Sequence, residues 1–131
     1  MLIKQSDGYV ALISAIIVSA VLLIIVFSIS FSVYFARFNI LDSEYKKIST
    51  GLAEACVEAA MLELAQDPSY AGGENKDVGS NQCSILSIPP PSGGEYTIRT
   101  KAVFRNSVTN IVVVVNSTDF SVISWNEIPT L

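Results

Sequence analysis

Two cysteines are the residues of this chain whose chemistry is easiest to define. Cys56 and Cys83 stand 27 positions apart, and the sequence contains no histidine. Two thiolates without histidine leave a zinc ion short of ligands, so the pattern disfavours a metal site. The pair fits a disulfide in an oxidising compartment, or two reduced, buried thiols acting as small apolar groups. A disulfide would close a loop of about 27 residues and contribute roughly 3 kcal/mol to a small domain.

Three glutamates are the candidates for acid–base chemistry. Glu54 and Glu58 share a helix face at i, i+4 spacing, and Glu63 follows one turn later. Carboxylates on the outer face of an amphipathic helix are typically just solvated, and no nucleophile stands beside these. The sequence has no phosphate-binding glycine loop, no G-x-S-x-G motif and no paired CxxC. We therefore predict that the chain is not an enzyme and uses no cofactor or small-molecule substrate.

Charge divides the 131 residues into two parts. Residues 9–36 carry no charged side chain, whereas residues 37–131 carry seven Lys or Arg and eleven Asp or Glu. Nucleic acid binding needs clustered Lys and Arg, so the acidic second part predicts no nucleic acid partner. The length suffices for one domain.

The uncharged segment, residues 9–36, is long enough to cross a membrane. As a helix it would span about 42 Å, and the hydrocarbon core of a bilayer is ~30 Å thick. A cleaved secretory signal has an apolar region of only about 7–15 residues, followed by a small-residue cleavage site. The apolar run here is about twice that length, and no such cleavage site follows it. The sequence therefore predicts a transmembrane helix that stays in the mature protein.

Small residues recur at every fourth position in two stretches of this helix. They are Ala11, Ala15 and Ser19, and then Ser28, Ser32 and Ala36. This spacing lets two helices approach closely in an apolar setting, and serine hydroxyls can bond across such a contact. The alternative interpretation is that serine and alanine are simply tolerated here.

From Arg37 the pattern becomes that of an amphipathic helix over residues 37–67. Its apolar positions step by four and three and form one stripe. They are Leu41, Tyr45, Ile48, Leu52, Ala55, Ala59 and Leu62. The helix is expected to end at Asp67-Pro68, because the residue before a proline resists helical dihedrals.

The remainder, residues 68–131, predicts an antiparallel sheet. Residues 71–82 are polar and glycine-rich and predict a loop. Strands are expected over residues 83–88, 95–105, 108–116 and 120–125. The short links between them suit hairpins. We expect an α+β fold, in which residues 37–67 pack on a sheet of three to four strands and form one globular domain with it.

The start of the chain resembles a class III prepilin signal, as found in type IV pilins and in the pseudopilins of type II secretion. A polar leader, MLIKQSDG, precedes the apolar run YVALISAII. In that family a dedicated peptidase cuts after the glycine, and the apolar helix is retained. The resemblance implies a leader of residues 1–8, cleavage between Gly8 and Tyr9, methylation, and a long helix packed under an antiparallel sheet. It also implies a filament or pseudopilus subunit whose partners are a prepilin peptidase, an assembly platform with its ATPase, and other pilins.

One position departs from the family pattern. Pilins usually have glutamate at the fifth mature position, which is Ile13 in this chain. Some minor pilins and tip pseudopilins also lack this glutamate, and the G-x-x-A-L-I pattern of Gly8, Ala11, Leu12 and Ile13 resembles theirs. The resemblance therefore favours a minor pilin or pseudopilin over a major subunit.

Two signals of topology conflict. Lys4 precedes the apolar helix, whereas Arg37, Lys46 and Lys47 follow it, which weakly favours a cytoplasmic domain. The cysteines and the resemblance favour an extracytoplasmic domain on a single-pass anchor in the inner (cytoplasmic) membrane, and we adopt that prediction. The alternative function is a signal-anchored membrane protein whose extracytoplasmic domain binds a partner and does not polymerise. Adhesion, DNA uptake, motility and secretion all remain open as roles of a filament.

Overall fold

The computed structural model describes residues 4–131, so Met1–Ile3 of the expected leader lie outside the described residues. One helix, α1 (Lys4–Gln66), precedes five strands. The strands are β1 (Glu74–Val78), β2 (Asn81–Ile85), β3 (Glu95–Phe104), β4 (Ser107–Asn116) and β5 (Val122–Ile128). The chain divides into two compact units, which we call the anchor unit (residues 1–41) and the sheet unit (residues 42–131).

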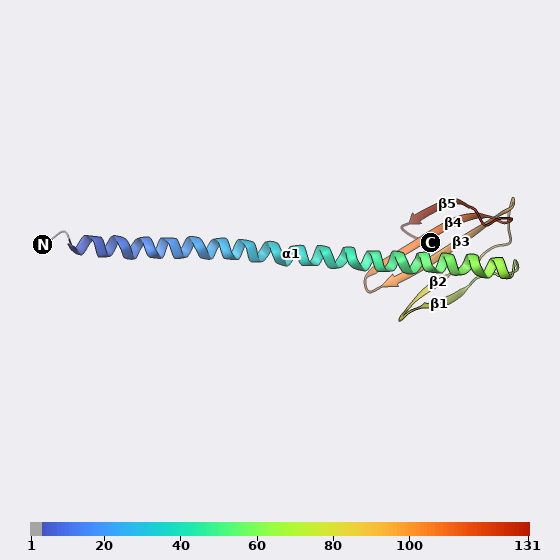
Figure 1. The fold of residues 1–131 in the computed structure, drawn as a ribbon, viewed down its shortest axis with the longest axis horizontal. Coiled ribbons are helices and arrows are strands. Elements are labelled where there is room, and N and C mark those ends of the chain that lie inside the picture. Colours follow the sequence, from blue (N-terminus) through green and yellow to red (C-terminus); the bar gives the residue numbers. More distant parts are fainter. Residues whose placement is uncertain (1–3) are drawn as a thin grey trace. The chain divides into compact units, whose positions relative to one another are not determined.

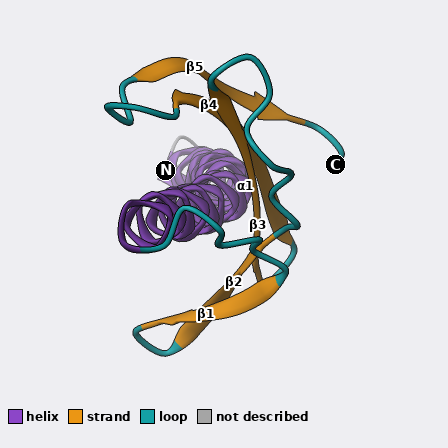
Figure 2. Cartoon of the chain, turned by 90° about the vertical axis from the view of Figure 1, so that its right-hand side faces the viewer, coloured by secondary structure: helices purple, strands orange, loops and turns teal. Residues whose placement is uncertain are grey.

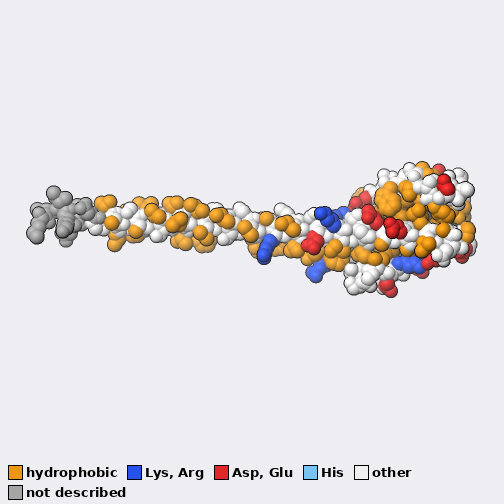
Figure 3. All heavy atoms as spheres, in the orientation of Figure 1, with side chains coloured by type: hydrophobic (Ala, Val, Ile, Leu, Met, Phe, Trp, Pro, Cys, Tyr) orange, Lys and Arg blue, Asp and Glu red, His pale blue; other side chains and the backbone are white. Residues whose placement is uncertain are grey.

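The anchor unit is helical from Lys4 to its end at Leu41. Apolar side chains cover the face of this helix that is drawn in Figure 3. Every large apolar side chain between residues 9 and 36 is exposed, from 37% at Ile13 to 66% at Tyr9. This helix therefore has no apolar face hidden by the chain itself.

The sheet unit is an antiparallel meander on one face of the C-terminal part of α1 (Figures 1 and 2). The strand order is β1-β2-β3-β4-β5, and each strand pairs antiparallel with the next. The expected α+β fold is confirmed. The expected number of strands is wrong, because the sheet has five strands and not three to four.

The additional strand is β1, which lies within the segment that we expected to be a loop. Its sequence, ENKDV, is almost entirely polar, so it lacks the alternation that marks a half-buried strand. A two-residue turn, Gly79-Ser80, joins it to β2, and Gly79 has a φ of 63°. A Gly-Ser pair is a hairpin signal, and it was the local clue to this strand.

The core lies between α1 and the inner face of the sheet. In β3 the inward positions are Tyr96, Ile98, Thr100 and Ala102, as the alternation predicted. They face the buried β4 residues Val115, Val113, Ile111 and Thr109 in register. The prediction that residues 95–105 form a strand with one solvated face is thus confirmed.

The sheet covers a different face of α1 from the predicted stripe. The buried positions are Ser49, Leu52, Ala53, Cys56, Val57, Ala60 and Leu64. Of the predicted stripe only Leu52 is buried, and Leu62 remains 61% exposed. Small residues at Ala53, Cys56 and Ala60 let the backbone of α1 approach the sheet, and Leu52, Val57 and Leu64 fill the space between them. The predicted amphipathic helix is present, but its buried face is rotated.

Candidate functional site

The first candidate is the uncharged segment of the anchor unit. Among the described residues, α1 is the one helix long and apolar enough to cross a membrane, and its most apolar window has a mean hydropathy of 3.2. None of that window is buried by the chain. Burial of apolar surface is the main stabilising term for soluble helices, so this segment requires cover from outside the chain.

The expected processing site lies at the start of this segment. Gly8 and Tyr9 both belong to α1 and are exposed. No atom lies within 4 Å of the position that a Cβ of Gly8 would occupy.

The two sets of small residues differ in their surroundings. Ala15 and Ser19 line a shallow groove of about 430 Å³, together with Leu12, Ile16, Ala20 and Leu23. Such a groove between larger side chains can accept a side chain of a second helix. Ala11 precedes this groove, and Ser28, Ser32 and Ala36 lie farther along the helix. The hydroxyls of Ser19, Ser28 and Ser32 each donate to the backbone carbonyl four residues earlier. Their donor groups are thus already satisfied within α1.

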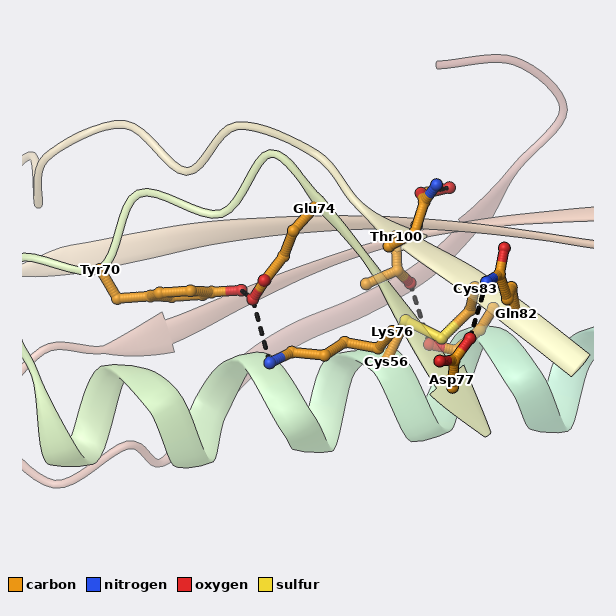
Figure 4. The surroundings of a disulfide bond; sticks show 11 residues. Cys56, Tyr70, Glu74, Lys76, Asp77, Gln82, Cys83 and Thr100 are labelled. Carbon is orange, nitrogen blue, oxygen red and sulfur yellow. Dashed lines mark hydrogen bonds and ion pairs between the residues drawn. A yellow bond between two sulfur atoms is a disulfide. The ribbon is translucent and has the colours of Figure 1, made fainter. Parts of the chain in front are cut away.

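The second candidate is the cysteine pair in the sheet unit (Figure 4). Cys56 of α1 and Cys83 of β2 form a disulfide, with their Cα atoms 6.1 Å apart. Both residues are fully buried. Of the two alternatives left open by the sequence, the disulfide is therefore the one present. It ties β2 to the middle of the buried face of α1.

The glutamates of α1 do not assemble into a site. Glu54 and Glu58 are exposed, whereas Glu63 accepts a hydrogen bond from Lys76 Nζ at 2.9 Å. Lys76 also lies 3.0 Å from Glu74 of the same strand, and its contact with Glu63 links β1 to α1. The pKa of the Lys76 ammonium is raised, first by its bond to Glu63 and then by Glu74.

The network continues from Glu74 to Tyr70, whose hydroxyl donates to the Glu74 carboxylate (Figure 4). Burial, followed by this hydrogen bond, raises the pKa of Tyr70 to about 12. The same hydrogen bond, followed by Lys76, lowers the pKa of Glu74. This network was not predicted, because residues 71–82 were expected to form a loop. It joins α1 to the edge of the sheet and brings no nucleophile together with a base.

A second polar cluster joins α1 to β4 and β5, at the edge of the sheet opposite β1. Lys46 Nζ donates to the carbonyl of Val108 and to Thr109 Oγ1, both at 2.9 Å, and pairs with Glu127 of β5. Ser49 and Thr109 share a buried hydrogen bond of 2.7 Å between their hydroxyls. Each buried hydroxyl thus has a partner, as burial of polar groups requires. The cluster fixes the orientation of the sheet on α1.

Among the residues that the structure describes, no group of three or more His, Cys, Asp or Glu side chains could hold a metal ion. Comparison of the chain with protein-family models, with curated proteins and with solved structures gives no match.

Proposed function

We propose that this chain is a type IV pilin-like structural subunit, of the minor pilin or pseudopilin kind, that acts by membrane anchoring and helix–helix assembly. In this proposal the anchor unit crosses the inner membrane once, and the sheet unit lies outside the cytoplasm. A prepilin peptidase processes the chain after Gly8. An assembly platform with its ATPase and other pilins complete the machinery.

The observation that carries the proposal is the exposure of apolar side chains all around the helix of the anchor unit. A helix that is apolar on every side needs either lipid or other helices as its surroundings. In an assembly mechanism the same segment would use both in turn, first the bilayer and then a bundle of helices. The groove at Ala15 and Ser19 supports the second use.

A second observation comes from the sheet unit. Ile48, Ala55 and Leu62 lie seven residues apart on α1 and are not fully buried by the sheet. With Tyr45, Leu52 and Ala59 they give the alternating steps of three and four that are typical of helix–helix packing. Leu52 of this stripe is buried in the core and Ile48 and Ala59 pack against it, so a helix of another subunit would meet the stripe at its exposed end, Leu62.

Ile13 favours an alternative function in which the chain is anchored in the membrane but does not polymerise. It replaces the glutamate that most pilins carry at this position, so an ion pair between that residue and a neighbouring subunit cannot form. The alternative function is a signal-anchored protein with an extracytoplasmic binding domain that does not polymerise. Cleavage after Gly8 separates the two proposals, because a simple signal anchor keeps its first residues.

The test is to express the full chain with and without a prepilin peptidase and to measure the mass of its N-terminal peptide. We expect a product that begins at Tyr9 only when the peptidase is present. A control prepilin in the same cells shows that the enzyme is active. A chain that still begins at Met1 or Leu2 beside a processed control would contradict the proposal.

Two glycine variants sharpen this test. Gly8→Val should block processing, because the peptidase requires the small residue before the cut. Gly51→Val is the matched control, because a Cβ at either glycine of α1 meets no atom within 4 Å. Gly51→Val should therefore be processed as the wild-type chain is. Loss of processing in both variants would indicate a general defect of the helix and not recognition of the leader.

A further inference from the structure

The hairpin formed by β1 and β2, residues 74–85, is joined to the rest of the sheet by few backbone pairs. β1 is an edge strand, and β2 is its one strand partner within residues 4–131. β2 pairs with β3 at three positions, Cys83 with Ala102, Ser84 with Lys101 and Ile85 with Thr100. One further bond runs from the Leu86 amide to the Arg99 carbonyl. By contrast, β3 and β4 pair at ten positions.

The hairpin also brings little apolar surface to the core. Val78 is the one apolar residue of β1, and it is only partly buried. The inward residues of β2 are Cys83 and Ile85. Since hydrophobic stabilisation scales with the apolar area buried, packing alone holds this hairpin far less firmly than it holds β3 and β4.

Two side-chain links attach the hairpin to α1. One is the ion pair between Lys76 and Glu63, whose side chains are both partly exposed. Exposed ion pairs contribute little to stability, because water and salt screen them. The other is the Cys56–Cys83 disulfide. The disulfide is thus the dominant link between the hairpin and α1.

The glycine-containing segment before the hairpin can act as its hinge. Gly72 and Gly73 precede β1 with φ values of 64° and 77°. A Cβ at Gly72 would lie 2.3 Å from the carbonyl oxygen of Leu86, so only glycine fits at this position while the hairpin packs as observed. Glycines at such positions also allow the backbone many other conformations. After β2, residues 86–94 form the loop that leads to β3.

We propose that the Cys56–Cys83 disulfide is a thiol-controlled lock on the β1–β2 hairpin. Its reduction releases residues 74–85 from α1, while α1 and β3–β5 stay folded. Release leaves the edge of β3 at Thr100–Ala102 without its strand partner and exposes the inward side of Ile85. The inference concerns the sheet unit alone and does not depend on the proposed filament function.

The reducing partner belongs to the class of dithiols. One thiolate of the dithiol attacks a sulfur of the bridge, which forms a mixed disulfide and frees the other cysteine. The second thiolate then closes the dithiol into its own disulfide. Cys56 and Cys83 gain two electrons and two protons and become thiols. Both residues are buried, so the attack takes place during a brief local fluctuation that exposes one sulfur while the bridge is still intact.

The experiment is hydrogen–deuterium exchange, read by mass spectrometry, on the full chain in detergent micelles with and without dithiothreitol. Reduction should speed the exchange of amides in residues 74–85 by roughly tenfold or more, and that of β3 and β4 by no more than about twofold. The double variant Cys56→Ala/Cys83→Ala should reproduce the reduced pattern without dithiothreitol and should not respond to it.

Lys76→Met is the matched control, because it removes the ion pair to Glu63 and keeps the disulfide. Its hairpin should remain protected until dithiothreitol is added. Three results would overturn the lock: unchanged exchange after reduction, loss of protection across β3 and β4 as well, or release of the hairpin by Lys76→Met alone. The second result would make the disulfide a requirement of the whole fold.

Discussion

The two parts of α1 place their apolar residues in different surroundings. Between residues 9 and 36 the large apolar side chains point in every direction and none is buried. Between residues 42 and 66, Val57 and Leu64 are fully buried under the sheet, while Leu62 is exposed. The first part has no polar face to turn towards water, whereas in the second part Glu54 and Glu58 occupy such a face.

This difference shows how one continuous helix can be suited to two solvents. The second part needs only one apolar face, because the sheet covers that face and water covers the rest. The first part has no cover among the described residues, which suits a segment surrounded by lipid or by other helices.

The largest effect is expected from charge in the first part. Replacing Leu22 and Ile25 together by arginine should weaken membrane insertion by about 5–7 kcal/mol, because each central arginine costs about 2.5–3.5 kcal/mol on insertion scales. The measurement is the fraction of full-length chain that resists alkaline extraction from membranes. Leu62→Arg is the control and should stay membrane-bound. Equal resistance of the double variant and the control would refute the role of the first part as an anchor.

The next effect separates two leucines of the second part. Leu64→Ala removes a fully buried side chain and should lower the free energy of unfolding by about 2–5 kcal/mol. Leu62→Ala, two residues away and 61% exposed, should change it by less than about 0.5 kcal/mol. Urea unfolding followed by the fluorescence of Trp125 measures both. A larger loss in Leu62→Ala than in Leu64→Ala would mean that the helix buries the face predicted from sequence and not the observed one.

The same pair of leucines shows what the sequence could and could not predict. The absence of charge over residues 9–36 and the alternation of Tyr96, Ile98 and Ala102 are local patterns, and both correspond to structure. The choice between two neighbouring apolar faces of α1 is not local. It depends on the close approach of the sheet to Ala53 and Ala60, which only the assembled fold supplies.

The features of the candidate site were also predictable only in part from the sequence. The pairing of Cys56 with Cys83 was one of two alternatives, and the structure contains it. The Tyr70–Glu74–Lys76–Glu63 network was not foreseen, because β1 is a polar edge strand stabilised by its turn and by its partner β2. Cleavage at Gly8 and Tyr9 stays a prediction, since recognition of a leader depends on an enzyme outside this chain.

A smaller effect distinguishes two glutamates on the polar side of the second part. Glu63→Gln removes the charge that Lys76 contacts and should lower the free energy of unfolding by up to about 1 kcal/mol at low salt. Glu58→Gln, on an exposed position of the same helix, should have no measurable effect. Raising the salt concentration should reduce the difference between the two variants, because salt screens exposed charges. A difference that persists in high salt would point to packing and not to charge.

The smallest effect is a dependence on alkaline pH at the far end of the same network. The pKa of Tyr70 is raised from 10.0 to about 12, first by burial and then by its hydrogen bond to Glu74. Because the folded state favours the neutral phenol, this contribution to stability is complete below pH 10 and is lost as the pH rises towards 12.

Glu74→Gln should lower the pKa of Tyr70 without returning it fully to 10.0, since burial remains. An ultraviolet titration of phenolate absorbance, with Tyr70→Phe identifying the residue and Glu54→Gln as control, measures the change. An unchanged titration in Glu74→Gln would assign the whole shift to burial, and the link from α1 through Lys76 would then end at Glu74.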